Sequence, residues 1–365
     1  MLLLCPYPEG VAAGQRLKYE PYIEDWRAHG WDVDVAPFMD MGLWRVAWEP
    51  GHLPEKALGT LRGYGRRVAQ LVRHRGHDLA YVFMWATPLG PPLVERIVRA
   101  RVPRLVYDLE DNVLVGQGLP RAADPNAFAR LVKGSAKPAF LVRAADHVIA
   151  SSPLLAGHVQ RLRGDDRVTY ITASVDTDRF RPRERGPSDG PVTIGWTGTF
   201  SSRVYLDMLS EMFVELARRV RFRLRVIGNF DHSLPGVDLE VVRWSAEREV
   251  EDMQAIDIGV YPLPDDPWVA GKSGLKAIQY MAFGIPVVAS HAGFTPEVVA
   301  DGETGILVRT ETEWLAALER LIRDPGLRQR LGTAGRRRAL ERYSRQAVRG
   351  QYRAVLEKVM TETPC

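Results

Sequence analysis

The chain has 365 residues, more than one ordinary hydrophobic core accommodates, so we expect two domains of similar size. An apolar content of 45% and a charged content of 26% are typical of a soluble globular protein. The net charge of +4 is too small to favour nucleic acid, but suits an anionic small ligand or an acidic membrane surface. Two cysteines exclude a disulfide framework, and no apolar run approaches the roughly 18–20 residues of a membrane span. We therefore expect a cytoplasmic protein, with at most peripheral contact at the membrane.

The first half of the chain alternates short apolar runs with amphipathic stretches. Strands are expected at 2–4, 31–36, 79–84, 104–107, 147–150 and 168–171. Helices are expected at 15–29, 55–77, 92–101, 126–144 and 153–162, whereas 39–54 reads as a loop. This alternation predicts a parallel sheet, in which ligands sit beyond the carboxyl ends of the strands.

A stretch rich in Pro, Gly and charge at 181–191 predicts a domain linker, after which the alternation restarts. Strands are expected at 192–196, 223–227, 239–242, 256–261 and 287–289. Helices are expected at 205–219, 247–254 and 275–282, and from 311, 325 and 344 onward. The fold class is therefore α/β, with two Rossmann-like domains facing a cleft. We place them at 1–182 and 191–343, with a last helix at about 344–360 packing back on the first domain.

The stretch 269–290 combines a loop, a helix start and a buried strand. Gly271 gives the loop freedom, and Lys272, Ser273 and Lys276 stand around the expected start of the helix. Unpaired N–H groups at a helix start, together with two lysines, predict a seat for an anion. A surface helix with solvated lysines is the alternative.

Two glycine turns follow expected strands. The first turn of the second domain contains Gly198, Thr199 and Arg203. Gly198 would let a phosphate approach the backbone, Thr199 offers a hydroxyl, and the Arg203 guanidinium offers a positive charge with several N–H donors. The other, at 10–14, ends in Gly14 and is followed by Gln15 and Arg16. Neither matches the dinucleotide fingerprint or the P-loop, and a plain tight turn would explain either one.

An acidic turn at 108–111 follows the strand 104–107. Asp108 and Glu110 could accept a proton from a hydroxyl nucleophile or bind a metal, whereas a helix cap with solvated charges is the alternative.

Trp44 and Trp48, followed by a basic helix, could face a lipid or an acceptor, or belong to a folded-back loop. No Ser–His–Asp order and no cysteine-based metal site is present in the sequence.

Four ordered stretches resemble one family: IGWTGT at 194–199, RVIGN at 225–229, LKAIQYMAFGIPVVAS at 275–290 and PEVVADGETGILV at 296–308. Together with VDTDRF at 175–180, they resemble the donor-binding domain of retaining GT-B glycosyltransferases, the large family 4 group. The first half resembles this family only in layout, because its acceptor-binding domains vary.

The resemblance implies roles for the residues singled out above. Arg203 and Lys272 would hold the diphosphate of a nucleotide sugar. The other donor-binding positions would be Gly198, Thr199, Ser273, Gly274, Lys276, Gln279 and Glu297. The family carries two glutamates where this chain has Gly271 and Gln279, and a histidine where it has Glu110. Glu110 and Asp108 would be the catalytic candidates, and Gly14, Gln15, Arg16, Trp44 and Trp48 would lie on the acceptor side.

The expected activity is transfer of a sugar from a nucleotide-diphosphate sugar to a hydroxyl, with retention of configuration, in cell-surface glycan or glycoconjugate synthesis. Cations would replace a metal, so neither a metal nor another cofactor is expected. The acceptor would be a glycan, a lipid-linked glycan or a protein, reached through peripheral contact with the inner membrane face. A nucleotide-sugar epimerase on the same scaffold and a degenerate, non-catalytic partner protein are the alternatives.

Overall fold

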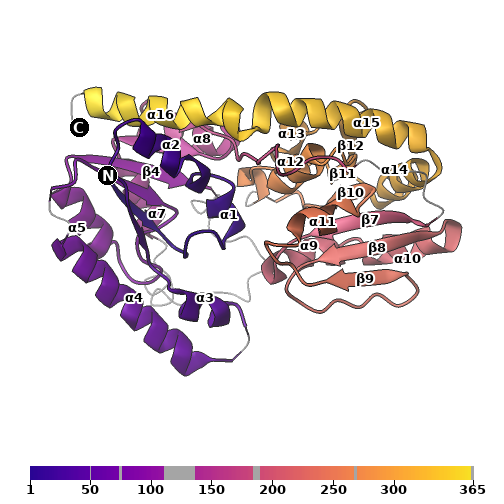
Figure 1. The fold of residues 1–365 in the computed structure, drawn as a ribbon, viewed down its shortest axis with the longest axis horizontal. Coiled ribbons are helices and arrows are strands. Elements are labelled where there is room, and N and C mark those ends of the chain that lie inside the picture. Colours follow the sequence, from indigo (N-terminus) through magenta and orange to yellow (C-terminus); the bar gives the residue numbers. More distant parts are fainter. Residues whose placement is uncertain (50, 74–75, 111–135, 184–189, 267–268, 363–365) are drawn as a thin grey trace. The chain divides into compact units, whose positions relative to one another are not determined.

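The computed structural model describes the chain except residues 50, 74–75, 111–135, 184–189, 267–268 and 363–365 (Figure 1). It divides into two compact units. The N-terminal unit comprises Met1–Ala173, Ala270–Ser273 and Val348–Cys365, and the C-terminal unit comprises Ser174–Val269 and Gly274–Ala347. Each unit contains a six-stranded sheet of parallel strands, which confirms the predicted α/β class with two Rossmann-like folds.

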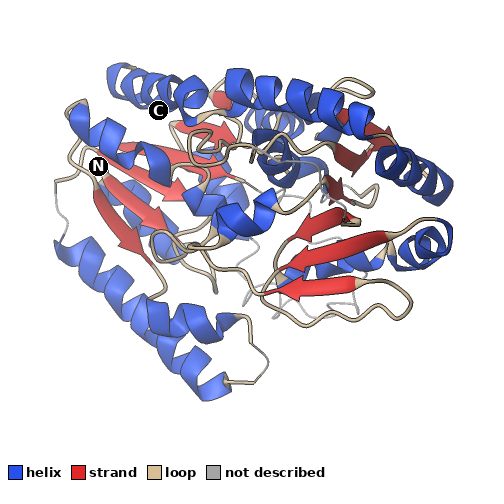
Figure 2. Ribbon diagram, turned by 45° about the vertical axis from the view of Figure 1, so that its right-hand side comes forward, coloured by secondary structure: helices blue, strands red, loops and turns tan. Residues whose placement is uncertain are grey.

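The sheet of the N-terminal unit, whose strands are among those drawn in red in Figure 2, has the strand order β2-β1-β3-β4-β5-β6. Its strands are β1 (Leu2–Cys5), β2 (Asp34–Pro37), β3 (Leu79–Phe83), β4 (Arg104–Leu109), β5 (His147–Ala150) and β6 (Val168–Tyr170). Four of them, β1, β3, β4 and β5, are buried throughout. Strands covered on both faces read as continuous apolar runs, which is why the sequence located them.

The helices of this unit are α1 (Ala13–Arg16), α2 (Ile23–Ala28), α3 (Met41–Ala47), α4 (Leu53–Arg73), α5 (Leu93–Arg101), α7 (Ala136–Ala144), α8 (Pro153–Arg163) and α16 (Arg345–Thr361). The single helix expected at 15–29 is wrong, because a 3-10 turn at Glu20–Tyr22 containing Pro21 separates α1 from α2. The loop expected at 39–54 is also wrong: Asp40 accepts a hydrogen bond from the Leu43 N–H and begins α3. Most of the helix expected at 126–144 lies outside the described residues.

The last helix, α16, belongs to the N-terminal unit from Val348 onward. Its apolar face consists of Val348, Tyr352, Val355, Leu356 and Val359, all buried in the same core as β1 and β3. The Tyr352 ring lies 5.0 Å from that of Tyr22 and 5.9 Å from that of Trp26, measured between centroids. The final segment of the described chain therefore completes the core that the first segment begins.

The sheet of the C-terminal unit has the strand order β12-β11-β10-β7-β8-β9. Its strands are β7 (Val192–Thr197), β8 (Phe222–Ile227), β9 (Leu239–Val242), β10 (Ile258–Tyr261), β11 (Val287–Ser290) and β12 (Gly305–Val308). Its helices are α9 (Arg203–Asp207), α10 (Ser210–Arg219), α11 (Glu249–Gln254), α12 (Leu275–Ala282), α13 (Thr295–Val298), α14 (Glu311–Arg323) and α15 (Pro325–Arg338). The helix expected at 205–219 is thus two helices.

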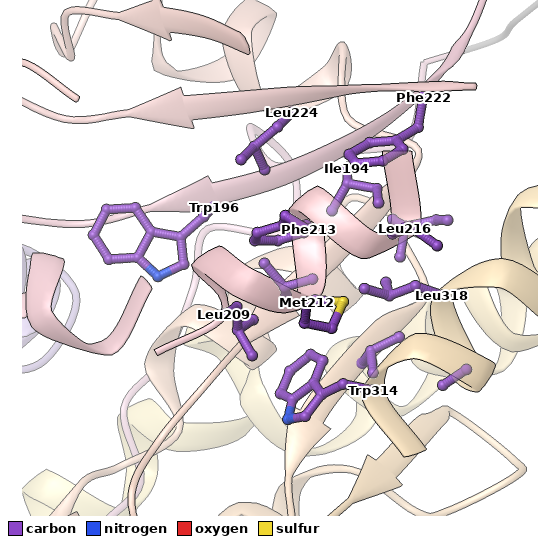
Figure 3. Packing of buried hydrophobic residues seen from close by; sticks show 14 of the residues in the cluster. Ile194, Trp196, Leu209, Met212, Phe213, Leu216, Phe222, Leu224, Trp314 and Leu318 are labelled. Atoms are coloured by element: carbon purple, nitrogen blue, oxygen red, sulfur yellow. The ribbon is translucent and has the colours of Figure 1, made fainter. Parts of the chain in front are cut away.

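Apolar side chains of α10 pack between the C-terminal sheet and α14 (Figure 3). Phe213 and Leu216 contact the strands through Ile194 and Leu224, while Met212 lies near Trp314 of α14. This core fixes β7 and β8, and the carboxyl ends of these two strands support the turns described next. Among the described residues, no helix is both long and apolar enough to cross a membrane.

Candidate functional site

Two glycines meet at the carboxyl ends of β7 and β8. The Gly198 N–H donates to the carbonyl of Ile227 at 3.0 Å, and a Cβ at Gly228 would lie 2.6 Å from the Gly198 carbonyl oxygen. A Cβ at Gly198 itself would collide with the ring of Trp196. Only glycine fits this close approach, and the absence of side chains leaves the backbone of the turn accessible to a phosphate-sized ligand.

Arg203 begins α9 immediately after this turn. Its Nε lies 3.4 Å from an Asp207 carboxylate oxygen, and its guanidinium lies 5.3 Å from the centre of the Phe200 ring. His232 adds an imidazole 3.8 Å from Asp207, and burial lowers the pKa of this histidine below its ordinary value. Asp207 lies one turn after Arg203 on the same helix, a spacing that the sequence reasoning overlooked. His232 comes from a separate segment after β8, so its contact with Asp207 could not be identified from local sequence.

Lys276, in the first turn of α12, lies against aromatic rings of the sheet. Its ammonium is 5.0 Å from the ring centre of Trp196 on β7 and 6.0 Å from that of Tyr261 on β10. Two rings attract a cation electrostatically and fix its position. The structure therefore brings Lys276 next to the Gly198 turn, which the sequence had placed in a separate stretch.

The start of α12 also lies beside α13. Gly274 adopts a left-handed conformation with φ of +72°, and a Cβ there would lie 2.7 Å from Val298 of α13. The neighbouring Glu297 has an exposed side chain, and its carbonyl accepts hydrogen bonds from Arg338 at 2.7 Å and Tyr343 at 3.4 Å. Lys272 and Ser273 precede Gly274 in the chain and group with the N-terminal unit by their contacts.

Tyr280 ties α12 to β7 and was missed by the sequence reasoning. Its hydroxyl accepts from the Thr197 N–H and donates to the Gly195 carbonyl, both at 3.1 Å. Its ring occupies the place that a Cβ of Gly259 on β10 would need. A tyrosine hydroxyl inside an otherwise apolar helix face was the available signal, because a buried hydroxyl requires partners.

In the N-terminal unit, Glu110 follows β4 and lies against Gly14 of α1. A Cβ at Gly14 would collide with the Glu110 carboxylate. The Ser151 hydroxyl donates to the Glu110 carbonyl and holds the backbone at this point. The structure thus joins two predicted site residues that lie almost one hundred positions apart in the sequence.

Comparisons with known proteins identify the family. Residues 191–324 match the family described as "Glycosyl transferases group 1". The MMP alpha-(1->4)-mannosyltransferase of Mycolicibacterium hassiacum is 27% identical over 97% of this chain and 89% of its own length. A D-inositol 3-phosphate glycosyltransferase 2 of Catenulispora acidiphila is 30% identical, over 51% of this chain and 48% of its own length.

The C-terminal unit thus contains a group 1 glycosyltransferase domain, at residues 191–324.

Solved structures share the fold of this glycosyltransferase along its whole length. Sucrose-phosphate synthase from Thermosynechococcus elongatus superposes with a TM-score of 0.75 at 19% identity, over 100% of both chains. Anabaena HepE in complex with UDP-glucose superposes with a TM-score of 0.66 at 17% identity, over 98% of this chain and 100% of that one. These likenesses confirm the expected GT-B class of fold.

Four predicted site residues with polar side chains are buried: Ser273 and Gln279 keep 5% and 8% exposure, whereas Asp108 and Gln15 are wholly enclosed. Asp108 is fully buried, where its carboxylate bonds to Lys18 and to the hydroxyl of Tyr81. Burial raises the pKa of Asp108, against the opposing effect of the Lys18 ammonium. A carboxylate enclosed in this way is not placed to take a proton from a substrate, so the structure argues against that role.

Gln15 is buried in the same manner. Its amide exchanges hydrogen bonds with the backbone of Tyr7 at 2.9 and 3.1 Å and donates to Glu20 at 2.9 Å. These bonds fold the loop 7–15 back on itself. These hydrogen bonds indicate that Gln15 stabilises the loop, whereas we expected it to contact the acceptor.

Trp44 and Trp48 stand in an aromatic cluster near the carboxyl ends of β1 and β3. The Tyr7 ring centre lies 5.1 Å from that of Trp44, 6.4 Å from that of Trp48 and 6.2 Å from that of Trp85. Trp48 is 58% exposed and the other three are partly buried. Met84, just before Trp85, has a φ of +59°, a strained conformation for a side-chain-bearing residue.

Among the residues that the structure describes, no group of three or more His, Cys, Asp or Glu side chains is arranged to hold a metal ion.

Proposed function

We propose that this glycosyltransferase moves a hexose from a nucleotide-diphosphate sugar to a hydroxyl acceptor with retention of configuration. The observation that supports this most strongly is the convergence of Lys276 with the Gly198 turn over the ring of Trp196. Cations and bare backbone at the carboxyl ends of parallel strands suit a diphosphate. The relatives named above, a mannosyltransferase and a protein solved with UDP-glucose, agree with a donor of this class.

The chemical demand of this reaction is stabilisation of the leaving diphosphate. Negative charge builds on it as the glycosidic bond breaks, so cations and N–H groups aimed there lower the energy of the transition state more than that of the ground state. We assign this task to Arg203, Lys272 and Lys276. Backbone N–H groups around Thr199, Ser273 and Gly274 would add to it, with Arg203 exchanging Asp207 for the phosphate.

The sugar end of the donor would be held by different residues. We propose that Glu297 contacts the sugar and that Gln279 hydrogen-bonds ribose hydroxyls, where the resembled family has a glutamate. Gly271 has no side chain for such a contact, so Glu110, seated against Gly14, is the carboxylate that we propose at the reacting centre. The leaving phosphate itself would accept the proton of the acceptor hydroxyl.

The acceptor would bind to the N-terminal unit. Arg16, Gly14 and the aromatic rings of Trp44 and Trp48 lie near the carboxyl ends of the strands of that unit, where parallel sheets bind ligands. A glycan, lipid-linked or protein acceptor remains within the proposal, as does a role in cell-surface glycan synthesis. The cytoplasmic location expected from the sequence stays a prediction.

Thermal shift with a panel of nucleoside diphosphates and their sugars tests the donor site. A ligand at about 100 times its Kd stabilises the folded state by about 2.7 kcal/mol, so the matching nucleotide should raise the melting temperature. Arg203→Ala and Lys276→Ala should each weaken binding roughly ten- to a hundredfold, because each removes a charge-assisted contact. Arg218→Ala, which removes an exposed arginine of α10, is the matched control.

Three results would contradict the proposal. Unchanged nucleotide binding in both the Arg203 and Lys276 variants would show that the diphosphate sits elsewhere. Conversion of the donor sugar to its epimer without an acceptor would identify an epimerase instead. Binding without any turnover on a panel of acceptors would favour the non-catalytic alternative.

A further inference from the structure

One side of α4 presents large apolar side chains to solvent. Leu58, Leu61, Val68 and Val72, here called the apolar stripe, are each between 49% and 68% exposed. At 100° per residue, these four positions fall on a single side of the helix. Contiguous exposed apolar surface is uncommon on soluble proteins and marks a contact with something else.

The opposite side of α4 fixes this orientation. A Cβ at Gly63 would lie 2.6 Å from the ring of Phe38, so the helix is pressed close to the sheet. Arg67 is buried and donates to the carbonyls of Ala36 at 2.7 Å and Ala86 at 2.9 Å. Rotating the helix to bury the stripe would break these hydrogen bonds and remove Arg67 from its buried partners. The contacts of Gly63 and Arg67 therefore keep the stripe facing solvent.

The charge around the stripe is mainly positive. From Lys56 to Arg73 the helix contains five cationic residues, and its one acid, Glu55, lies in the first turn, 4.0 Å from His52. Arg62 and Arg73 are exposed and lie on one flank of the stripe, and Arg66 on the same flank is partly exposed while paired with Asp40 at 2.7 Å. The stripe is therefore bordered by positive charge.

The neighbouring helix α5 has the same character. Leu93 and Ile97, one turn apart, are 61% and 43% exposed, and Arg96 and Arg101 are exposed beside them. The one acid of α5, Glu95, is buried and accepts from Thr87. The Arg101 guanidinium donates to the Leu71 carbonyl at 2.6 Å, which joins the end of α5 to that of α4. Both helices run along the outside of the N-terminal unit (Figures 1 and 2).

We propose that the outer faces of α4 and α5 bind the surface of an anionic lipid bilayer. Apolar side chains would enter the boundary between headgroups and acyl chains, and the flanking arginines would contact lipid phosphates. A second copy of this chain fits less well, because two such faces would place like charges opposite one another. This inference does not depend on the sugar donor or on the reaction.

Co-sedimentation of the full chain with lipid vesicles tests the proposal. The chain should bind vesicles of phosphatidylcholine and phosphatidylglycerol in equal parts, release them as salt rises, and bind phosphatidylcholine alone far more weakly. Arg62→Gln and Arg73→Gln should each reduce binding about fivefold. Leu61→Ser with Val68→Ser should reduce it at least tenfold, since both side chains would leave the lipid.

Leu154→Ser, which alters a comparably exposed leucine of α8, is the matched control and should leave vesicle binding unchanged. Melting temperature and nucleotide binding, measured on every variant, separate loss of lipid contact from loss of fold or of the donor site. Equal binding to neutral and anionic vesicles, or binding that survives both sets of substitutions, would overturn the proposal. So would a dimer in solution that the Leu61/Val68 variant dissociates.

Discussion

Gly14 matters because it contacts Glu110, a residue that is remote in the sequence. The sequence predicted a glycine turn at 10–14 and an acidic turn at 108–111, but nothing in either pattern pairs them. Their contact depends on how α1 lies over the end of β4, which is a property of tertiary packing. The same holds for Lys276 and Trp196, and for Asp108, whose buried partner Lys18 could not be identified from local sequence.

Gly14→Ala should therefore impair activity without abolishing the fold. The added methyl group meets the Glu110 carboxylate, which has to move because the Ser151 bond holds its backbone. We expect turnover to fall at least tenfold, with nucleotide binding by the C-terminal unit retained. The measurements are steady-state kinetics and thermal shift with the nucleotide.

Gly350→Ala is the matched control for this substitution. Gly350 lies in α16, and a Cβ there meets no atom within 4 Å. Alanine at an open helical position stabilises a protein by up to about 1 kcal/mol. Full activity in Gly14→Ala would show that Glu110 is not confined by this contact, or that it does not act at the reacting centre.

At the scale of elements, the sequence predicted buried strands better than helix boundaries. Runs such as Leu79–Phe83 are apolar at every position and admit one interpretation. The break at Pro21 and the cap at Asp40 were visible in the sequence, and their physical meaning was overlooked. The division of 203–219 into α9 and α10 had no comparable signal, since its apolar positions continue through the break.

His147 on β5 should make stability depend on pH. Burial, then the positive charges of Lys358 and Arg163, lower the pKa of His147 to about 4. In the unfolded chain this histidine has an ordinary pKa near 6.5, so between about pH 6.5 and 4 it is protonated in the unfolded state and neutral in the folded state. Stability therefore falls as pH decreases from about 6.5 towards 4, by about 2 kcal/mol at pH 5.

The check is unfolding of wild-type protein and of His147→Asn at about pH 7.5 and about pH 5. The asparagine variant retains a group for the Thr169 hydroxyl, which contacts the imidazole Nε2 at 2.8 Å, and does not titrate. Its stability should depend less on pH, whereas the exposed His29→Asn should behave like wild type. Identical pH dependence in all three proteins would mean that other groups are responsible.

At the scale of the whole molecule, the helix that ends the described chain belongs to the unit that begins it. Repetition of strand and helix predicted two similar halves, but the allocation of α16 depends on which apolar face accepts it. Tyr22 and Trp26 supply that face in the core of the N-terminal unit. Sequence periodicity gives the apolar side of a helix and does not identify its partner.

Tyr352→Ala should destabilise the N-terminal unit by about 3–5 kcal/mol, because it removes a fully buried ring from this core. Hydrogen exchange should show lost protection in β1 and β3, with β7 to β12 unaffected. Glu357→Ala, on the exposed side of the same helix, should change stability by less than about 0.5 kcal/mol. Loss of protection confined to the C-terminal strands would assign the helix to the other unit.

The placement of α16 also bears on how the protein is made. On the ribosome, Met1–Ala173 emerges first, but the helix that covers Tyr22 and Trp26 is translated only after the C-terminal unit. At about 5–20 residues per second, the intervening segment takes roughly ten to thirty seconds to synthesise. Throughout that interval an aromatic surface stands uncovered on the nascent chain. The order of synthesis thus makes the core of this unit complete only after the C-terminal unit has been translated.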